Sequence, residues 1–405
     1  MDLQKLRNDF PLLASPSNKP VMYFDNACMS LKPRAVINAM NQYYEQFPAC
    51  GGPGRSGHAL GARVREAVDQ SRQTIARAIG AQHPNEIIFT RNTTESINLV
   101  ARSFRWNAGD VVLTTDKEHN SNLIPWLNTR RLSNIRHAVI PSLPDNTFDL
   151  SAFEQLLKLG SVRLVSVGLV SNLDGVRVPI AEIIKRAHAA GAMVMVDAAQ
   201  AMLHSPLNVQ ALGVDFLAFS GHKMLGPTGT GVLYGKRELL ENLEPFLLGG
   251  DTVSATTYTD FQLLDVPERF EAGLQDYAGI IGLGAAMEYL QSIGWPFIES
   301  QDQQMNRIIT EGIAHLKGVH MIGPADPALR GGIVAFTIKG MDHHQVAVML
   351  EQMNAILVRS GQHCVHSWFG SRGIPGSVRA SVAFYNTVDE AEQFVQAMEK
   401  ITTLL

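Results

Sequence analysis

The feature that most constrains the fold of this chain is an alternation of short apolar runs with longer stretches of helical periodicity, which continues through about residue 235. The apolar runs are typical of parallel strands that helices cover on both faces. Stretches such as Val64–Ile79 and Ile180–Ala190 place apolar residues at helical spacing between them. This order of elements predicts an α/β fold with a mainly parallel sheet. The expected strands are Glu86–Thr90, Asp110–Thr114, Arg163–Val170, Ala192–Val196, Val214–Phe219 and Gly231–Tyr234.

The pattern changes near residue 294, where two long helical patterns begin to alternate with short strand-like stretches. We expect residues 294–405 to form a smaller α+β domain, residues 21–293 to form a large domain, and residues 1–20 to form an N-terminal arm. No linker rich in Gly, Ser or Pro separates the two domains, so a helix near Gly279–Ser292 is predicted to join them. The expected strands of the smaller domain are Gly332–Ile338, Ile356–Arg359 and Val378–Ala383.

Composition excludes several classes of function. The chain holds 34 Lys and Arg against 38 Asp and Glu, a balance too even for a protein that coats nucleic acid or an anionic membrane. Its three cysteines, Cys28, Cys50 and Cys364, form no Cys-x-x-Cys pair, so we expect neither a disulfide framework nor a zinc ribbon, and a cytoplasmic location. No signal peptide and no membrane span are expected. The low share of charged residues, 18%, favours an oligomer.

The chemistry is expected at the carboxyl ends of two successive strands. Asp197 ends one apolar run, and Gln200 follows three residues later; the next strand runs into Ser220, His222 and Lys223. Ligands of open α/β sheets bind at this edge. A Schiff-base amine and a carboxylate that pairs with a pyridinium nitrogen are what pyridoxal phosphate requires of a protein, so Lys223 and Asp197 are the candidate pair. Gln200 is placed to donate a hydrogen bond to the ring oxygen.

A phosphate group also needs hydrogen-bond donors. The segment Arg91–Glu95 follows a strand and begins a helix, with Thr93 and Thr94 as the predicted N-cap pair. A helix N-terminus attracts anions through its free N–H groups. Ser220 and His222 are candidates for two more donors, so the segment predicts a phosphate site.

Two further residues are candidates for catalysis. His119 follows the strand Asp110–Thr114 and is placed to stack on the cofactor ring and to help move a proton. Cys364 ends a polar, glycine-containing segment, which indicates an exposed loop thiol, and Arg359 and His363 nearby are expected to favour its thiolate. The sequence His363-Cys364-Val365-His366 offers too few ligands for a metal, so no metal site is predicted.

Several motifs, in order over nearly the whole chain, resemble those of one family. They are Tyr23–Ala27, Asn92–Glu95, Glu118-His119, Val170–Asn172, Val196–Gln200, Phe219–Lys223, Gly226–Gly229, Arg269–Gly273 and Val358–Cys364. The sequence resembles the class V, fold-type I pyridoxal-phosphate enzymes, in particular the group II cysteine desulfurase and selenocysteine lyase branch. The resemblance implies a homodimer with the active site at the subunit boundary, and an N-terminal arm that packs with the small domain.

The resemblance also implies a role for each matched residue. Lys223 would attach the cofactor and Asp197 would pair with its pyridinium nitrogen, while His119 stacks on the ring and Gln200 contacts the ring oxygen. The matched phosphate-binding positions are Thr93, Thr94, Ser220 and His222, and the matched substrate-carboxylate positions are Asn172 and Arg379, with Arg359 as a further substrate-binding candidate. Cys364 would take sulfur from L-cysteine as a persulfide, release alanine and pass the sulfur to an acceptor protein. Selenocysteine is a second candidate substrate.

The sequence departs from the family pattern in places that bear on the pocket. Leu274 stands where the family often has a threonine that reaches the other subunit's phosphate, and Asn120 stands where a second histidine is usual. Val365-His366 follows Cys364 in place of the usual alanine, and the segment Cys50–His58 replaces a His-Arg-Gly stretch. Cys28 and Cys50 are expected to serve packing.

Two other readings stay open from the sequence. The first keeps pyridoxal phosphate but assigns other class V chemistry, as in an aminotransferase, an epimerase or a β-lyase, and leaves Cys364 without a role. The second is a scaffold that binds the cofactor without turnover. All three readings require the cofactor, so only product analysis separates them.

Overall fold

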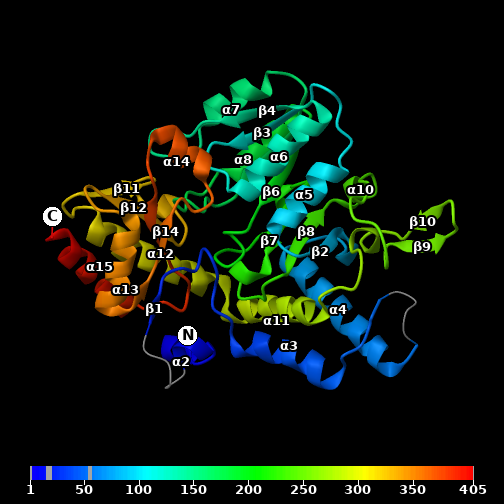
Figure 1. Cartoon of the computed structure of the whole chain (residues 1–405), viewed down its shortest axis with the longest axis horizontal. Helices are drawn as coiled ribbons and strands as arrows, with labels where there is room; N and C mark the ends of the chain where they lie inside the picture. Colours follow the sequence, from blue (N-terminus) through cyan, green and yellow to red (C-terminus); the bar gives the residue numbers. More distant parts are fainter. Residues whose placement is uncertain (1, 15–20, 53–56, 405) are drawn as a thin grey trace.

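The computed structural model describes residues 2–14, 21–52 and 57–404. Its larger sheet has seven strands in the order β2-β8-β7-β6-β5-β3-β4 (Figure 1). Their bounds are β2 Ile87–Thr90, β3 Val111–Thr115, β4 Arg136–Ile140, β5 Val162–Gly168, β6 Met193–Asp197, β7 Phe216–Ser220 and β8 Gly231–Gly235. Neighbouring strands run parallel from β7 through β4, and β8 is antiparallel to both of its neighbours. The predicted mainly parallel sheet is confirmed, whereas the edge strand β4 was not predicted.

Helices cover both faces of this sheet, as the apolar strands require. Along β2, Ile87 and Phe89 face one layer and Ile88 faces the other. The first layer holds α3 (Arg34–Gln46), α4 (Ala59–Ala78), α7 (Leu150–Leu157), α8 (Ile180–Ala189) and α11 (Tyr277–Ile293). The opposite layer holds α5 (Thr93–Ser103) and α6 (Asn120–Ser133). The burial of both faces explains why the strands carry so few polar residues.

The smaller sheet is antiparallel, in the order β11-β12-β15-β14, and packs against α12, α13 and α15. Bounds are β11 Val319–Ile322, β12 Ile333–Ile338, β14 Arg359–Gly361, β15 Ser377–Ser381, α12 Trp295–Ile313, α13 His343–Asn354, α14 His366–Arg372 and α15 Val388–Thr402. The expected strand Ile356–Arg359 is wrong as one element, because β13 (Ile356–Leu357) pairs with β1 (Met22–Tyr23) and β14 pairs with β15. The helix α11 spans the predicted joining segment, while the division at residue 294 stays a prediction.

The remaining elements are short. They are α1 Leu3–Arg7, α2 Pro11–Ala14, α9 Val209–Leu212, α10 Arg237–Leu240, β9 Val253–Thr256 and β10 Phe261–Leu263, with 3₁₀ turns at Pro84–Glu86, Gly221–Lys223, Glu268–Phe270 and Pro327–Leu329. The hairpin of β9 and β10 projects from the body of the molecule (Figure 1). Within the described residues, no helix combines the length and the hydropathy that crossing a membrane requires.

The N-terminal segment is packed by a buried aromatic residue. Phe10 is fully buried, and its ring lies 4.6 Å from the ring centroid of Tyr385 and 6.0 Å from that of Tyr289 on α11. Arg7 donates to the carbonyl of Tyr385 at 2.6 Å and to Glu390 of α15 at 2.7 Å. The described part of the arm therefore contacts α11, α15 and the segment between β15 and α15.

These contacts predict a large effect of truncating Phe10. Phe10→Ala should lower the free energy of unfolding by about 3 to 5 kcal/mol, because it removes a buried ring and leaves a cavity. Leu159→Ala, at a residue that is 51% exposed, should change it by less than about 0.5 kcal/mol. Urea unfolding followed by circular dichroism measures both. Equal effects of the two substitutions would show that the arm does not contribute to the core.

Candidate active site

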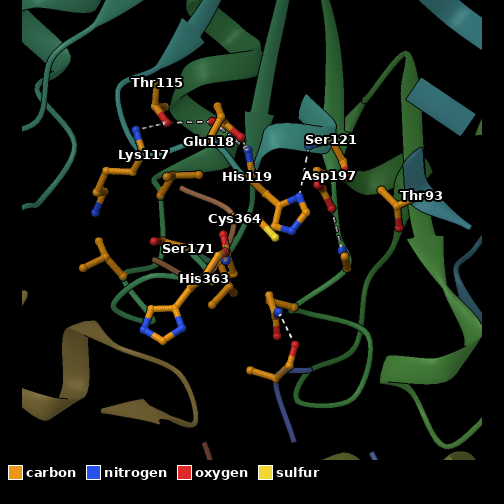
Figure 2. Close-up of a pocket in the computed structure, with 18 of the residues that line it drawn as sticks. Thr93, Thr115, Lys117, Glu118, His119, Ser121, Ser171, Asp197, His363 and Cys364 are labelled. Atoms are coloured by element: carbon orange, nitrogen blue, oxygen red, sulfur yellow. Dashed lines mark hydrogen bonds between the residues drawn. The ribbon is translucent and has the colours of Figure 1, made fainter. Parts of the chain in front are cut away.

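A cavity of about 270 Å³ opens at the carboxyl ends of the parallel strands (Figure 2). All twelve residues predicted for the site line this one cavity: Thr93, Thr94, His119, Asn172, Asp197, Gln200, Ser220, His222, Lys223, Arg359, Cys364 and Arg379. They come from both sheets, since Arg359 and Arg379 lie on β14 and β15 and the others, apart from Cys364, lie at tips of the larger sheet. The structure thus brings together residues that lie as far apart in sequence as Thr93 and Arg379.

Asp197 and Lys223 lie at adjacent strand ends, as predicted. Asp197 ends β6, and Lys223 ends the 3₁₀ turn that follows β7. Burial raises the pKa of the Asp197 carboxyl, which the Lys223 charge opposes, and burial lowers the pKa of the Lys223 amine, which Asp197 opposes. Within the described residues, the Lys223 amine has no hydrogen-bond partner. An amine with a lowered pKa and no partner is available as a nucleophile.

Hydroxyl groups line the end of the cavity at the N-terminus of α5. The Thr93 hydroxyl lies 2.7 Å from the Ser220 hydroxyl, and the Thr93 N–H donates to the same Ser220 oxygen at 2.9 Å. Thr93 and Thr94 are the first helical residues, and Asn92 is the N-cap, so the predicted threonine cap pair was wrong. A Cβ on Gly231 would lie 2.6 Å from the Cα of Asn92. A side chain at that position of β8 would displace the turn, so glycine keeps this anion-binding end open.

Ser121 and Lys32 are site neighbours that the sequence did not indicate. The Ser121 hydroxyl lies 2.7 Å from that of Thr94 and joins the same polar wall. Lys32 donates to the carbonyl of His222 at 3.0 Å. Burial, together with the charges of Lys223 and Lys32, lowers the pKa of His222 to about 4, so this imidazole is neutral near pH 7.

His119 points into the cavity from the N-cap of α6 (Figure 2). Its Nδ1 accepts the backbone N–H of Ser121 at 3.0 Å, which places the ring proton on Nε2. Burial and the charge of Lys223 lower the pKa of His119 to about 3. The ring is therefore neutral and can offer its flat face and an Nε2–H to a ligand.

Glu118, directly before His119, is a buried acid. It belongs to the motif Glu118-His119, but no role was predicted for it. Its carboxyl accepts hydrogen bonds from the Thr115 hydroxyl at 2.7 Å, the Asn122 amide at 2.7 Å and the Gly168 N–H at 3.1 Å. Burial raises the pKa of Glu118 to about 7 despite these bonds. The bonds tie the tip of β3, which carries His119, to the end of β5.

Arg379 supplies a buried cation on the opposite wall. Its Nη1 donates to the carbonyl of Asn172 at 2.7 Å, and its Nη2 lies 3.8 Å from Asp25. Its Nε has no partner among the described residues. Burial lowers the pKa of Arg379 to about 10, so it stays charged near pH 7. Arg359 is more exposed and lies 3.7 Å from Asp25. Asp25, which belongs to the motif Tyr23–Ala27 and was assigned no role, is a neighbour of the site that contacts both arginines.

Cys364 lies on a strained turn and is exposed, as predicted. The Val365 N–H donates to the Gln362 carbonyl at 2.8 Å, which closes a β-turn over His363 and Cys364. Both central residues have positive φ, 50° and 59°, a conformation that costs a non-glycine residue about 1 to 2 kcal/mol. Burial lowers the pKa of His363 to about 2. His363 is therefore neutral, so the prediction that its charge favours the Cys364 thiolate was wrong.

Of the remaining predicted residues, some line the cavity and others lie outside it. Gln200 donates to the carbonyl of Ala27 at 2.8 Å, next to Cys28, and both Gln200 and Cys28 line the cavity. Cys50 is partly buried outside this lining, and Leu274 is exposed. Part of the predicted segment Cys50–His58 lies outside the described residues.

Comparisons with known proteins agree with this geometry. The chain matches the family model described as Aminotransferase class-V over residues 22–394. It is 38% identical to a cysteine desulfurase of Dickeya dadantii over 409 residues, which cover 100% of this chain and 97% of that protein. The solved apo structure of a cysteine desulfurase from Thermococcus onnurineus NA1 is 38% identical, with a TM-score of 0.93, over 99% of this chain and 98% of that one. A cysteine desulfurase structure from Escherichia coli is 34% identical, with a TM-score of 0.88, over 100% and 99%. The predicted α/β fold is confirmed.

The raised pKa of Glu118 predicts a pH-dependent stability. The unfolded carboxyl ionises near its ordinary pKa of 4.5, whereas the folded one ionises near 7. Between these values the folded protein holds the extra proton, so stability should fall as pH rises. The shift corresponds to roughly 3 kcal/mol at most.

Glu118→Gln removes this titration. Urea unfolding at pH about 5 and about 8 should show a loss of stability in the wild type, relative to the variant, of roughly 2 to 3 kcal/mol. A constant difference between the two proteins across this range would show that Glu118 does not titrate there.

Proposed function

The chain belongs to the aminotransferase class-V family, and on this premise we propose that it is a pyridoxal-phosphate-dependent cysteine desulfurase. The observation that carries the proposal is that one cavity holds a buried carboxylate, Asp197, an exposed thiol, Cys364, and a lysine amine, Lys223, that has no hydrogen-bond partner in the described part of the chain. The names of the relatives and neighbours that match full length support the same activity.

The residues present suit pyridoxal phosphate. Lys223 would hold its aldehyde carbon, and the buried Asp197 would pair with its ring nitrogen. The hydroxyls of Thr93 and Ser220, with the N-terminus of α5, would hold its phosphate. When bound, the cofactor supplies an electron-withdrawing ring that stabilises negative charge on the substrate carbon skeleton.

Arg379 and Asn172 would bind and orient the substrate. The Arg379 Nε is buried without a partner among the described residues, so an incoming carboxylate would supply the acceptor that this guanidinium lacks. The backbone carbonyl of Asn172 accepts a hydrogen bond from Arg379 Nη1 and keeps the guanidinium turned toward the cavity. Arg is suited to a planar, two-point grip on a carboxylate.

Three residues of the chain would handle protons and sulfur. Lys223, with its lowered pKa, can accept a proton from the substrate Cα and return one. His119 holds its proton at Nε2 and covers the ring face without adding charge. The Cys364 thiolate attacks the substrate sulfur: an S–S bond forms, the C–S bond breaks, and its electron pair stays with the carbon, which takes a proton to become the methyl group of alanine.

The finer parts of the proposal concern partners and substrate range. We include a homodimer, transfer of the Cys364 persulfide sulfur to an acceptor protein, and selenocysteine as a second substrate. The exposure of Cys364 supports transfer to a partner, since a protein acceptor must reach the sulfur. Arg359, which is also exposed, lines the same cavity as Cys364 and lies 3.7 Å from Asp25.

The test is product analysis with L-cysteine and a reductant. The cofactor-loaded wild type should form alanine and sulfide in equal amounts, and Cys364→Ala should lose at least about a hundredfold of this activity while it retains the cofactor absorbance. Cys50→Ala, which changes a thiol outside the cavity lining, is the matched control and should keep full activity.

Two results would contradict the proposal. Equal activity of wild type and Cys364→Ala would remove Cys364 from the reaction. Absence of alanine from every protein would exclude desulfuration of free cysteine, and the other class V chemistries, transamination, epimerisation or β-elimination, would then be assayed directly.

A further inference from the structure

The turn that carries Cys364 requires support from outside itself. His363 and Cys364 both adopt the left-handed conformation that glycine or asparagine usually occupies in such turns. One hydrogen bond, from Val365 to Gln362, closes the turn. Residues held in this conformation persist only where the surrounding structure determines them, so the groups that contact the turn control where the thiol points.

The larger sheet supplies contacts from two of its tips. At the tip of β3, the Asn120 N–H donates to the carbonyl of Cys364 at 2.8 Å, and the Asn120 amide nitrogen lies 2.9 Å from His366 Nδ1. Because an amide nitrogen is a donor, His366 Nδ1 is the acceptor of this bond. At the tip of β5, the Asn172 amide donates to the carbonyl of His363 at 2.7 Å. The turn and the residue after it are therefore held by bonds that begin on the opposite domain.

The helix α14 keeps His366 in place for this bond. Val365, Trp368 and Phe369 are buried in a small apolar cluster around the start of α14. Arg372 ends the helix 3.0 Å from Asp116 of the β3 tip, and its guanidinium lies 4.4 Å from the centre of the Trp368 ring. Movement of the helix away from the β3 tip would break the ion pair between Arg372 and Asp116.

Two departures of this chain from the family pattern are the two partners of one bond. Asn120 stands where a second histidine is usual, and His366 lies in the segment that replaces the usual residue after Cys364. In the structure they meet side chain to side chain. The bond is made by two residues that lie outside the predicted cofactor-binding and carboxylate-binding positions.

We infer that Asn120 and His366 are positioning residues, which lock the strained turn so that the Cys364 thiol faces the substrate sulfur. The inference rests on the proposed function, because it assigns the acceptor role to Cys364. If the bond is lost, the turn can relax toward ordinary backbone angles, and the Cys364 thiol then no longer points toward the substrate sulfur. Transfer of sulfur then slows, while binding of substrate at Arg379 does not change.

The variants Asn120→Ala and His366→Ala each remove this bond, and the backbone N–H of residue 120 remains in both. Each should lower kcat for alanine formation about three- to tenfold, the effect of one net hydrogen bond, with KM and cofactor absorbance unchanged. The double variant should be no slower than either single one, because both remove the same bond. His366→Asn places an amide oxygen near the position of Nδ1 and should restore kcat to within about twofold of the wild type.

Amide hydrogen exchange tests, without turnover, whether the bond between Asn120 and His366 holds the turn. In both alanine variants the peptide that covers residues 362–368 should exchange severalfold faster than in the wild type, while the peptide of β6 should be unchanged. His315→Ala is the matched control, because His315 is exposed and its Nδ1 lies 3.2 Å from the backbone carbonyl of Glu311. This substitution should change neither the exchange of residues 362–368 nor kcat.

Each outcome decides the inference. Unchanged exchange over residues 362–368, additive losses in the double variant, or failure of His366→Asn to restore kcat would overturn it. If no protein, wild type included, forms alanine, the proposed function fails instead, and the exchange data alone decide whether Asn120 and His366 hold the turn.

Discussion

The site depends on the contacts of the buried Arg379 guanidinium with Asn172 and Asp25. Arg379 lies on β15 of the smaller sheet, donates to the backbone carbonyl of Asn172 in the segment after β5 of the larger sheet, and lies near Asp25 in the N-terminal segment. A buried charge that loses its partners costs several kcal/mol. Separation of the two sheets would take the Asn172 carbonyl away from this cation and leave it only Asp25 as a partner among the described residues. Their contact is what places Lys223 and Cys364 in one cavity.

Burial sets the reactivity of the groups around that cavity. It lowers the pKa of Lys223, keeps His119 and His222 neutral, and raises the pKa of Glu118 toward neutrality. The cost of taking these groups out of water is met by the apolar packing of the sheet beneath them. The same desolvation gives a site with few fixed charges, in which Arg379 is a charged group available to a carboxylate.

The sequence was sufficient to predict that Asp197 and Lys223 share one cavity, because the carboxyl ends of adjacent parallel strands lie at the same edge of a sheet. Strand existence was also predictable from long apolar runs, whereas β4 is a half-exposed edge strand with no such run. Asp25, Ser121 and the burial of Glu118 depend on contacts between distant segments, which no local pattern encodes. The charge expected on His363 failed for the same reason, since its buried ring lies against Phe369 of α14 and Ser377 of β15.

The most direct measurement is the location of sulfur after turnover without a reductant. The cofactor-loaded protein would be mixed with L-cysteine, blocked with iodoacetamide and digested, and its cysteine peptides would be compared by mass spectrometry. We expect one added sulfur atom on the peptide that contains Cys364, and none on those that contain Cys28 or Cys50. Alanine formation with the added sulfur on Cys28, or on no cysteine, would contradict this expectation.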